Sequence, residues 1–277
     1  TMGKTGQLTP TAIFESVEID GTSVSRASLH NVSIFKGFDL HKGDTIAVYK
    51  ANMIIPQISQ NITRGSDAGE VFEVPEVCPI CGKSVSVVKE NDSEVLMCMN
   101  AGCKGKLLGE INAFVSKKAH DINGLSEATL QLLIDNGLVT SPIDLYNLKD
   151  HSAELSRLPR MGAKKIANLL NSIEASKNTT LEKFIVGLNI PLIGSRAAKD
   201  IAKYEETRTR ELKTRRPYTM FIADAANDFD FTCIEGLGIE RNVSIHRYVR
   251  ENYDYVLKLA NIFSFPELSE DTSLKNT

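Results

Sequence analysis

The stretch Cys78-Pro-Ile-Cys81-Gly82, continued by Cys98-Met-Asn-Ala-Gly-Cys103, contains four of the five cysteines of the chain. Their spacing is Cys-x2-Cys, then sixteen intervening residues, then Cys-x4-Cys. Two close thiol pairs separated by a short hairpin are typical of a structural zinc site. With thiolates in all four tetrahedral positions no coordination site is open, so we expect zinc to stabilise the fold and not to perform chemistry.

Other interpretations of these thiols are a redox pair or a disulfide, and a reducing compartment disfavours disulfides. Iron could use the same four ligands. The fifth cysteine, Cys233, lies in an apolar context and is expected to be a buried small hydrophobe.

The composition of the 277 residues is ordinary for a globular chain of two to four small domains, with 42% hydrophobic and 24% charged residues. This excludes disorder as the main state. No apolar run approaches the roughly 18 residues of a membrane helix, and the N-terminus lacks the layout of a signal peptide. We therefore expect a cytoplasmic protein with no membrane partner.

Residues 1–70, on the N-terminal side of the cysteines, have short β-rich runs separated by turns at Asp20-Gly21, Lys42-Gly43-Asp44 and Arg64-Gly65. The runs are Thr11–Ile19, Thr45–Tyr49 and Met53–Ile58. They predict a small β-barrel domain, followed by the zinc module at residues 71–103. The predicted fold class is therefore multidomain α+β.

Residues 104–262, on the C-terminal side, have apolar residues at helical spacing, and residues 263–277 are expected to be a tail. The predicted helices are Lys106–Lys118, Ser126–Asn136, Ala163–Ser176, Thr180–Leu188, Ser195–Lys203 and one long stretch from about Ile239 to Asn261.

Four pentapeptides of the form apolar-x-x-apolar-Gly/Ser recur in this helical part. They are Ile122-Asn-Gly-Leu-Ser126, Leu158-Pro-Arg-Met-Gly162, Ile190-Pro-Leu-Ile-Gly194 and Ile234-Glu-Gly-Leu-Gly238. This is the helix-hairpin-helix pattern. Glycine in the hairpin permits backbone angles closed to other residues, and it leaves amide N–H groups uncovered for a phosphate oxygen. A glycine turn between two packed helices is the simpler alternative for any single copy.

Basic residues follow the glycine in the second and third copies, namely Lys164, Lys165 and Arg196. We predict phosphate contacts at Gly162 and Gly194 with these side chains, and at Gly236 and Gly238 of the fourth copy. The net charge of −3 gives no argument for a nucleic-acid partner, but residues 104–220 contain 19 basic and 13 acidic residues, a net charge of +6. A solvated mixed-charge surface is the alternative, and it is favoured for Arg208, Arg210, Arg215 and Arg216.

The sequence resembles the bacterial NAD-dependent DNA ligases. Gly3-Lys-Thr-Gly-Gln-Leu-Thr-Pro10 is similar to the segment that opens the OB-fold domain of that family, and Val24-Ser-Arg-Ala-Ser-Leu-His-Asn31 is similar to its most recognisable OB-fold motif. Lys42-Gly-Asp44, Ile54-Ile-Pro56, the four cysteines and the four hairpins follow in the expected order. The resemblance implies an OB fold, a zinc finger and a helix-hairpin-helix DNA-binding domain, with Lys4, Arg26 and His30 as DNA-contacting residues of the OB part.

The resemblance also limits the chemistry. The family's catalytic lysine lies in a Lys-x-Asp-Gly motif of an adenylation domain, and these 277 residues contain no such motif. Glu18-Ile-Asp-Gly21 begins with an acid, which cannot form a phosphoramidate with AMP. We therefore expect no catalytic residue here, and we expect NAD only through an adenylation domain in cis or in trans. The family's C-terminal BRCT domain is not recognised in these residues either. In the OB part, Asn52-Met53 replace the Gly-Asp that the family usually has before Ile54-Ile-Pro56.

The expected function is the DNA-binding clamp of a ligase that seals nicks in duplex DNA during replication and repair, acting as a monomer at the bacterial nucleoid. The alternatives are a free-standing, non-catalytic protein that binds DNA junctions and a zinc-stabilised protein scaffold.

Overall fold

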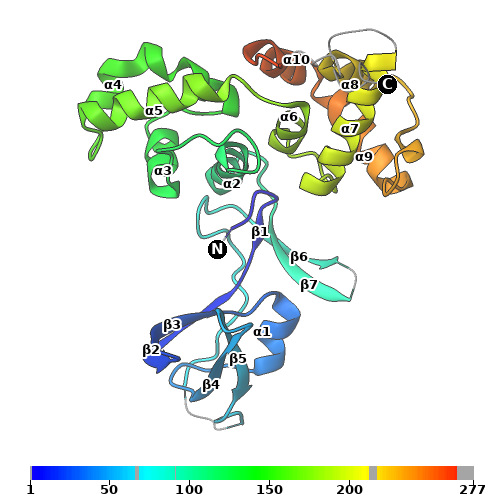
Figure 1. The fold of residues 1–277 in the computed structure, drawn as a ribbon. Helices are drawn as coiled ribbons and strands as arrows, with labels where there is room; N and C mark the ends of the chain where they lie inside the picture. The colour runs from blue at the N-terminus through cyan, green and yellow to red at the C-terminus, as the bar shows by residue number, and fades with distance from the viewer. Residues whose placement is uncertain (1, 66–68, 91, 212–216, 267–277) are drawn as a thin grey trace. The chain divides into compact units, whose positions relative to one another are not determined.

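A computed structural model describes residues 2–65, 69–90, 92–211 and 217–266 (Figure 1). The chain divides into two compact units, with the boundary between Gly109 and Glu110.

The first unit contains a four-stranded sheet in the order β2-β3-β5-β4, with β3 and β5 parallel and the other pairs antiparallel (Figure 1). The strands are β2 (Thr11–Ile19), β3 (Thr22–Ser28), β4 (Ile46–Ala51) and β5 (Ile55–Asn61). Register shifts within the β2–β3 and β4–β5 pairs help the sheet to curl. The curled sheet is an OB-like half-barrel, which agrees with the predicted small β-barrel domain.

The core of this sheet consists of Ala27, Leu29 and Ile58, with Phe14 and Phe35 packed against them. A helix that sequence analysis missed, α1 (Val32–Phe38), supplies Phe35. Asp20 and Gly21 both have positive φ angles, as a tight β2–β3 hairpin requires. The Glu18–Gly21 stretch is therefore the end of β2 followed by a structural turn at Asp20 and Gly21.

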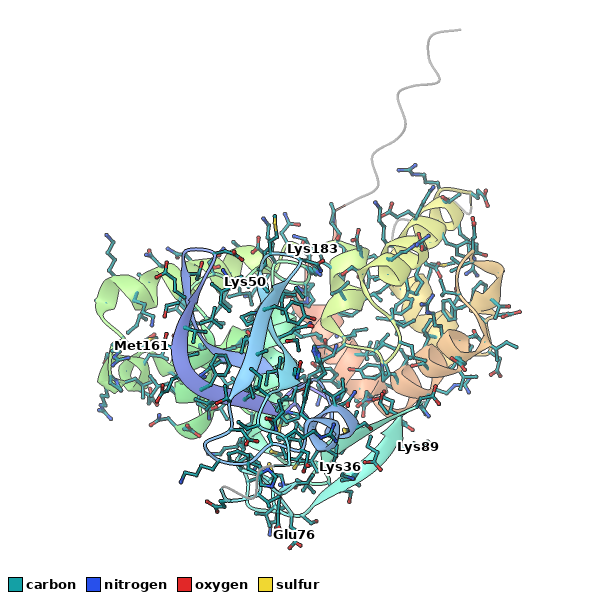
Figure 2. All side chains as sticks on the ribbon, turned by 90° about the horizontal axis from the view of Figure 1, so that it is seen from below. Lys36, Lys50, Glu76, Lys89, Met161 and Lys183 are labelled. Atoms are coloured by element: carbon teal, nitrogen blue, oxygen red, sulfur yellow. The ribbon has the colours of Figure 1, made fainter. Side chains whose placement is uncertain are left out.

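A second sheet of the first unit has the order β1-β7-β6, with all neighbours antiparallel. Its strands are β1 (Gln7–Leu8), β6 (Val85–Glu90) and β7 (Ser93–Cys98). Lys36 of α1, labelled in Figure 2, forms an ion pair of 2.7 Å with Glu94 on β7. Residues 7–8 therefore pair with the cysteine-containing segment and not with the OB sheet.

The second unit is helical, and α2 crosses the boundary between the two units. The helices are α2 (Lys104–Val115), α3 (Glu127–Asp135), α4 (Ser152–Arg157), α5 (Ala163–Ser176), α6 (Leu181–Gly187), α7 (Ser195–Glu211), α8 (Pro217–Ala226), α9 (Ile239–Glu251) and α10 (Tyr253–Ile262), with 3₁₀ helices η1 (Pro142–His151) and η2 (Phe231–Cys233). The five shorter predicted helices are present as α2, α3, α5, α6 and α7. Helices α4 and α8 and both 3₁₀ helices were not predicted from the sequence.

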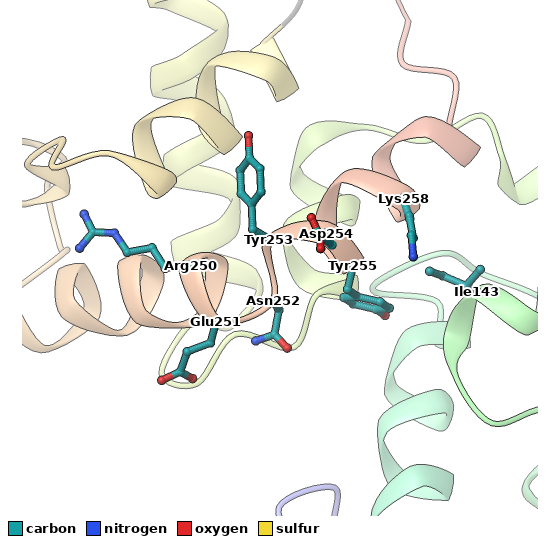
Figure 3. A pocket seen from close by; sticks show the side chains of 8 residues that line it. All are labelled: Ile143, Arg250, Glu251, Asn252, Tyr253, Asp254, Tyr255 and Lys258. Carbon is teal, nitrogen blue, oxygen red and sulfur yellow. The ribbon is translucent and has the colours of Figure 1, made fainter.

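The long predicted helix from Ile239 to Asn261 is wrong as a single element, because it breaks at Asn252. The backbone of Asn252 leaves the helical region, and its side chain donates back to the Tyr248 carbonyl at 2.9 Å. Figure 3 shows Asn252 and Tyr253 projecting in opposite directions between α9 and α10. Asparagine competes for backbone hydrogen bonds in this way, which explains why helices often end at it.

The second unit has an aromatic core around His120, whose ring stacks on Phe263 with centroids 4.4 Å apart and lies 4.3 Å from Phe114. Phe184 and Tyr146 also pack against Phe263. The start of the predicted tail therefore packs into the core, and residues 267–277 lie outside the described residues.

Cys233 is exposed, so the prediction of a buried cysteine is wrong. It ends η2, a short surface turn in which Phe231 takes the buried position instead. Among the described helices, none is both long enough and apolar enough to cross a lipid bilayer.

Candidate metal centre and nucleic-acid interface

The four predicted cysteine ligands converge, with all their Sγ atoms within 4.8 Å of one another. The Cys78 and Cys103 Sγ atoms are 4.0 Å apart, and those of Cys81 and Cys98 are 3.6 Å apart. With metal–sulfur bonds of about 2.3 Å, the edge of a tetrahedral site is about 3.8 Å long. The four cysteines are therefore positioned to bind one metal ion and are compatible with zinc.

Local turns explain why the sequence brings the sulfurs together. The Ile80 N–H points at the Cys78 sulfur at 3.4 Å, and the Gly82 N–H donates to the Cys78 carbonyl at 2.9 Å. Gly82 adopts a φ of +67°, which favours glycine. Asn100 closes the other turn, because its side chain accepts from the Gly102 N–H at 3.1 Å.

The thiols have strongly different proton affinities. A hydrogen bond from the Lys83 backbone lowers the pKa of Cys81 to about 6, whereas burial raises the pKa of Cys98 to about 12. A metal ion is needed to hold the buried Cys98 as a thiolate near neutral pH. Three of the four thiols are buried and Cys81 is half-buried, and among the described residues no carboxylate or histidine joins the cluster, which fits a structural metal site better than a catalytic one.

The four hairpins share one backbone design, here named hairpins 1 to 4 (residues 122–126, 158–162, 190–194 and 234–238). The third residue of each has a positive φ, +91° at Gly124, +62° at Arg160, +64° at Leu192 and +84° at Gly236. The fourth residue of each is buried: Leu125, Met161 (labelled in Figure 2), Ile193 and Leu237. A helix begins directly after the fifth residue: α3, α5, α7 and α9.

The structure corrects the role of the final glycines in these hairpins. Gly162 has a φ of −71° and Gly238 a φ of −86°, angles that any residue adopts. The positive φ angle occurs at the third residue of each hairpin. The final glycines matter only because they leave the backbone N–H groups uncovered. A Cβ atom at Gly162, Gly194 or Gly238 would meet no other atom within 4 Å. The fold itself therefore does not require glycine at these three positions.

Hairpin 2 lies beside an open hollow of about 720 Å³ lined by Gly124, Gly162, Lys164 and Lys165, together with Asn123, Ala163 and Asn168. The first N–H groups of α5 have no intrahelical partner, and no side chain caps the helix at Gly162. The positive end of the helix dipole adds to the charge of the lysines. This hollow has the chemistry of an anion site.

The predicted basic residues differ in their surroundings. Lys164 and Arg196 are exposed and have no ion-pair partner within the described parts of the chain. Lys165 is half-buried, and its Nζ donates to Thr129 Oγ1 of α3 at 3.1 Å. Lys165 thus joins hairpin 2 to hairpin 1.

Hairpins 1 and 4 differ from the other two at the helix start. In hairpin 1 the Ser126 side chain accepts from the Thr129 N–H at 3.3 Å and so covers the N-terminus of α3. In hairpin 4 the start of α9 has no side-chain cap, and the Arg241 guanidinium donates to the Gly236 carbonyl. A basic residue therefore lies beside hairpin 4 as well, fixed by the hairpin itself.

The arginines after hairpin 3 divide into two groups. Arg208 forms an ion pair with Asp224 and lies over the Phe229 ring, 4.8 Å from its centroid. These contacts pack α7 against α8, so Arg208 is a half-buried packing residue and not the solvated side chain that the alternative predicted. Arg215 and Arg216 lie outside the described residues.

On the OB sheet, Arg26 is exposed on β3 and is paired in register with Ile13 of β2. His30 is exposed with a φ of +59°, and its N–H donates to Ser28 Oγ at 3.1 Å. Asn31 caps α1, accepting from the Ile34 N–H at 2.8 Å, so its role is structural. Lys4 lies apart from Arg26 and His30 in sequence and belongs to the segment that packs on α2.

An apolar surface at the β4–β5 turn was not predicted from the sequence. Met53 and Ile54 are 84% and 77% exposed, and Asn52 and Met53 both have positive φ angles. Replacement of the usual Gly-Asp at residues 52–53 was the signal in the sequence, but its consequence was not predictable from the pattern.

A second hollow, of about 490 Å³, lies at the α9–α10 break (Figure 3). Arg250 and Lys258 line it together with Glu251 and Asp254, so its charges oppose one another. It favours neither an anion nor a cation.

Comparison with known proteins relates both units to one family. Residues 1–70 match the family described as the NAD-dependent DNA ligase OB-fold domain. The DNA ligase of Lachnoclostridium phytofermentans is 44% identical over 200 residues, covering 72% of this chain and 30% of the relative. Those of Carboxydothermus hydrogenoformans and Thermosipho africanus are 38% and 35% identical, covering 93% and 98% of this chain. The chain spans 37% and 39% of the length of these two relatives.

Proposed function

The chain belongs to the NAD-dependent DNA ligase family through its OB-fold domain, and we propose that it is the part of such an enzyme that grips duplex DNA around a nick. The observation that carries this proposal is the open space at Gly162, Gly194 and Gly238, the residues directly before α5, α7 and α9. Glycine there is dispensable for the fold, since a Cβ atom would meet nothing within 4 Å. It leaves room for an external group to approach the backbone N–H groups, and a phosphate oxygen fits that role.

The contacts proposed are to the phosphate backbone. Lys164, Lys165 and Arg196 neutralise phosphates beside the N-termini of α5 and α7, and Arg26, His30 and Lys4 act from the first unit. Gly236 and Gly238 provide the equivalent backbone site in hairpin 4. Because such contacts do not distinguish bases, binding has little sequence preference and a steep dependence on salt.

The metal in this proposal is zinc, held by Cys78, Cys81, Cys98 and Cys103. It supplies no chemistry to the reaction and stabilises the fold. In the family's reaction a lysine takes AMP from NAD and passes it to the 5′-phosphate, and the 3′-hydroxyl then displaces AMP. The residues described here align the two DNA ends for that displacement, and an adenylation domain in cis or in trans supplies the lysine and binds NAD. By the same proposal the protein works as a monomer in the bacterial cytoplasm, at the nucleoid.

The test is a fluorescence-anisotropy titration with nicked, intact and single-stranded DNA at two salt concentrations. The variant is Lys164→Glu with Arg196→Glu, and the matched control is Lys89→Glu with Lys149→Glu, which makes the same charge change on exposed residues of β6 and η1. We expect the first pair to weaken duplex binding by about tenfold or more and to reduce the salt slope by about two.

If the test and control pairs lose the same amount of duplex affinity, the effect comes from the net charge of the protein and not from these two sites. Unchanged binding in the test pair would favour the protein-scaffold alternative. If the protein binds DNA junctions but an added adenylation domain gives no ligation, a free-standing, non-catalytic protein would be favoured.

A further inference from the structure

The N-terminal strap, defined here as residues 2–8, packs on the cysteine-containing module before the chain enters the OB sheet at Thr11. Gln7 and Leu8 pair with Met97 and Leu96 of β7. The Gly3 N–H donates to the Gln7 carbonyl at 2.9 Å, and the Gly6 N–H donates to the Gly3 carbonyl at 2.9 Å. The strap is therefore a compact loop whose last residues extend a sheet of another module.

The first two turns of α2 form the other wall for the strap. A Cβ atom at Gly105 would lie 2.5 Å from the Met2 Sδ, and one at Gly109 would lie 2.7 Å from the Lys4 Cα and N atoms. Gly105 and Gly109 are four residues apart and so share one face of the helix. Gly109 admits the backbone of residues 3–4 because it lacks a side chain, whereas Gly105 makes room for the side-chain ends of Met2 and Ile80.

Two metal-ligand cysteines support these contacts directly. The Cys98 N–H donates to the Gly6 carbonyl at 2.9 Å. The Cys103 carbonyl accepts from the Lys106 and Leu107 N–H groups at 2.9 and 3.2 Å, which starts α2, and its sulfur lies 3.8 Å from the Met2 sulfur. The positions of Cys98 and Cys103 thus fix both surfaces that the strap touches.

We propose that the four-cysteine centre is a latch for the strap, so that metal binding fixes the path by which the chain enters the OB sheet. When the metal leaves, Cys98 and Cys103 lose their common partner, β7 and the start of α2 separate, and residues 2–8 are released. Any polypeptide that leads into Met2 in a longer chain is then no longer held against the module. The inference rests on the proposed metal site and does not depend on DNA binding.

The experiment is amide hydrogen exchange, measured by mass spectrometry on residues 2–8, with bound zinc measured in the same samples. The variant is Gly109→Ala. Alanine for glycine inside a helix normally stabilises the helix, but here it would displace the Lys4 backbone. The matched control is Gly37→Ala in α1 of the same unit, where a Cβ atom would meet nothing within 4 Å.

We expect Gly109→Ala to speed exchange in the strap by about tenfold or more while zinc remains bound, because a local contact and not the module is lost. Gly37→Ala should leave strap exchange unchanged. Removing zinc with a chelator should release the strap in the unaltered protein to at least the same degree.

Slow strap exchange in Gly109→Ala would overturn the role of the glycine face. Slow strap exchange after complete loss of zinc would overturn the latch. A protein that binds no zinc would overturn both the metal site and the latch, whereas failure of the DNA-binding test alone would leave the latch standing.

Discussion

Lys165 on α5 donates a hydrogen bond of 3.1 Å from Nζ to Oγ1 of the buried Thr129 on α3. The bond joins the helices that follow hairpins 1 and 2. It also fixes the ammonium beside the hollow at Gly162, since Lys165 is one of its lining residues. Lys165 therefore has a packing role in addition to the proposed phosphate contact, whereas its neighbour Lys164 is exposed and has only the latter.

Removing the Lys165–Thr129 bond should therefore lower stability, whereas removing the Lys164 charge should lower only DNA affinity. Thr129→Val removes the acceptor while preserving shape, and we expect it to lower the free energy of unfolding by about 1 kcal/mol. Lys164→Met should change that free energy by less than about 0.5 kcal/mol and still weaken DNA binding several-fold. Urea titration and anisotropy on the same samples measure both effects. A stability loss in Lys164→Met as large as that in Thr129→Val would contradict the division of roles.

Glu205 on α7 is 0% exposed, and neither of its carboxylate oxygens has a hydrogen-bond partner within the described residues. Burial and the nearby Asp224 carboxylate raise the pKa of Glu205 to about 7. The folded state thus binds this proton more tightly than the unfolded state. The stabilisation that the bound proton provides is complete below the usual carboxyl pKa of about 4.5 and is lost as the pH rises toward 7.

We therefore expect Glu205→Gln to stabilise the second unit at pH 8 by on the order of 2 kcal/mol and to have little effect at pH 4.5. The amide keeps the shape of the protonated acid and removes the cost of a buried charge. Urea unfolding at the two pH values measures the difference. Glu205 Oε2 also lies 3.8 Å from Arg208 Nη1. A variant that is less stable than the unaltered protein at pH 8 would show that this charge pair is needed to hold α7 on α8.

The features that were predicted best from the sequence are those that depend on residues close together in the chain. Strand Thr11–Ile19 and helix Ala163–Ser176 occur with the predicted bounds, since alternation and helical periodicity are local patterns. The cysteine cluster followed from spacing alone. The strap did not, because the meaning of Gly105 and Gly109 depends on Met2 and Lys4, a hundred residues earlier in the chain. The positive φ of Leu192 was not predicted either. Leucine rarely adopts such an angle, and here the hairpin imposes it.

His120 is buried beside Phe114 and Phe263, and its burial lowers its pKa to about 3. A folded-state pKa below the unfolded value of about 6.5 means that stability is lost as the pH falls from 6.5 toward 3. His120→Leu should cost about 1–3 kcal/mol at pH 7.5 through lost ring packing. That cost should shrink as the pH falls to 4.5, because leucine cannot be protonated. A cost that is constant across this range would exclude His120 as a source of acid sensitivity.

Removal of the metal should affect the two units differently. All four ligands lie in the unit that ends at Gly109, and the core of the other unit contains none of them. We expect a chelator to lower the melting temperature of the first unit and leave the helical transition unchanged. Hydrogen exchange in α5 and α7 reports on the helical unit separately. Coincident loss of protection in both units would mean that they unfold as one cooperative unit.

Ser126 and Gly162 occupy the same position in hairpins 1 and 2, and only the serine covers its helix N-terminus. Gly162→Ser should therefore raise the free energy of unfolding by a few tenths of a kcal/mol, because serine is a better N-cap than glycine. The same hydroxyl would occupy an N–H group that we assign to a phosphate, so duplex affinity should fall several-fold. Gly37→Ser in α1 is a control, since Gly37 lies in the other unit, has no positive φ, and a Cβ atom there would meet nothing within 4 Å. If the variant is more stable and binds DNA as tightly as before, hairpin 2 is only a packing turn. If it is more stable and binds DNA more weakly, Gly162 serves DNA binding.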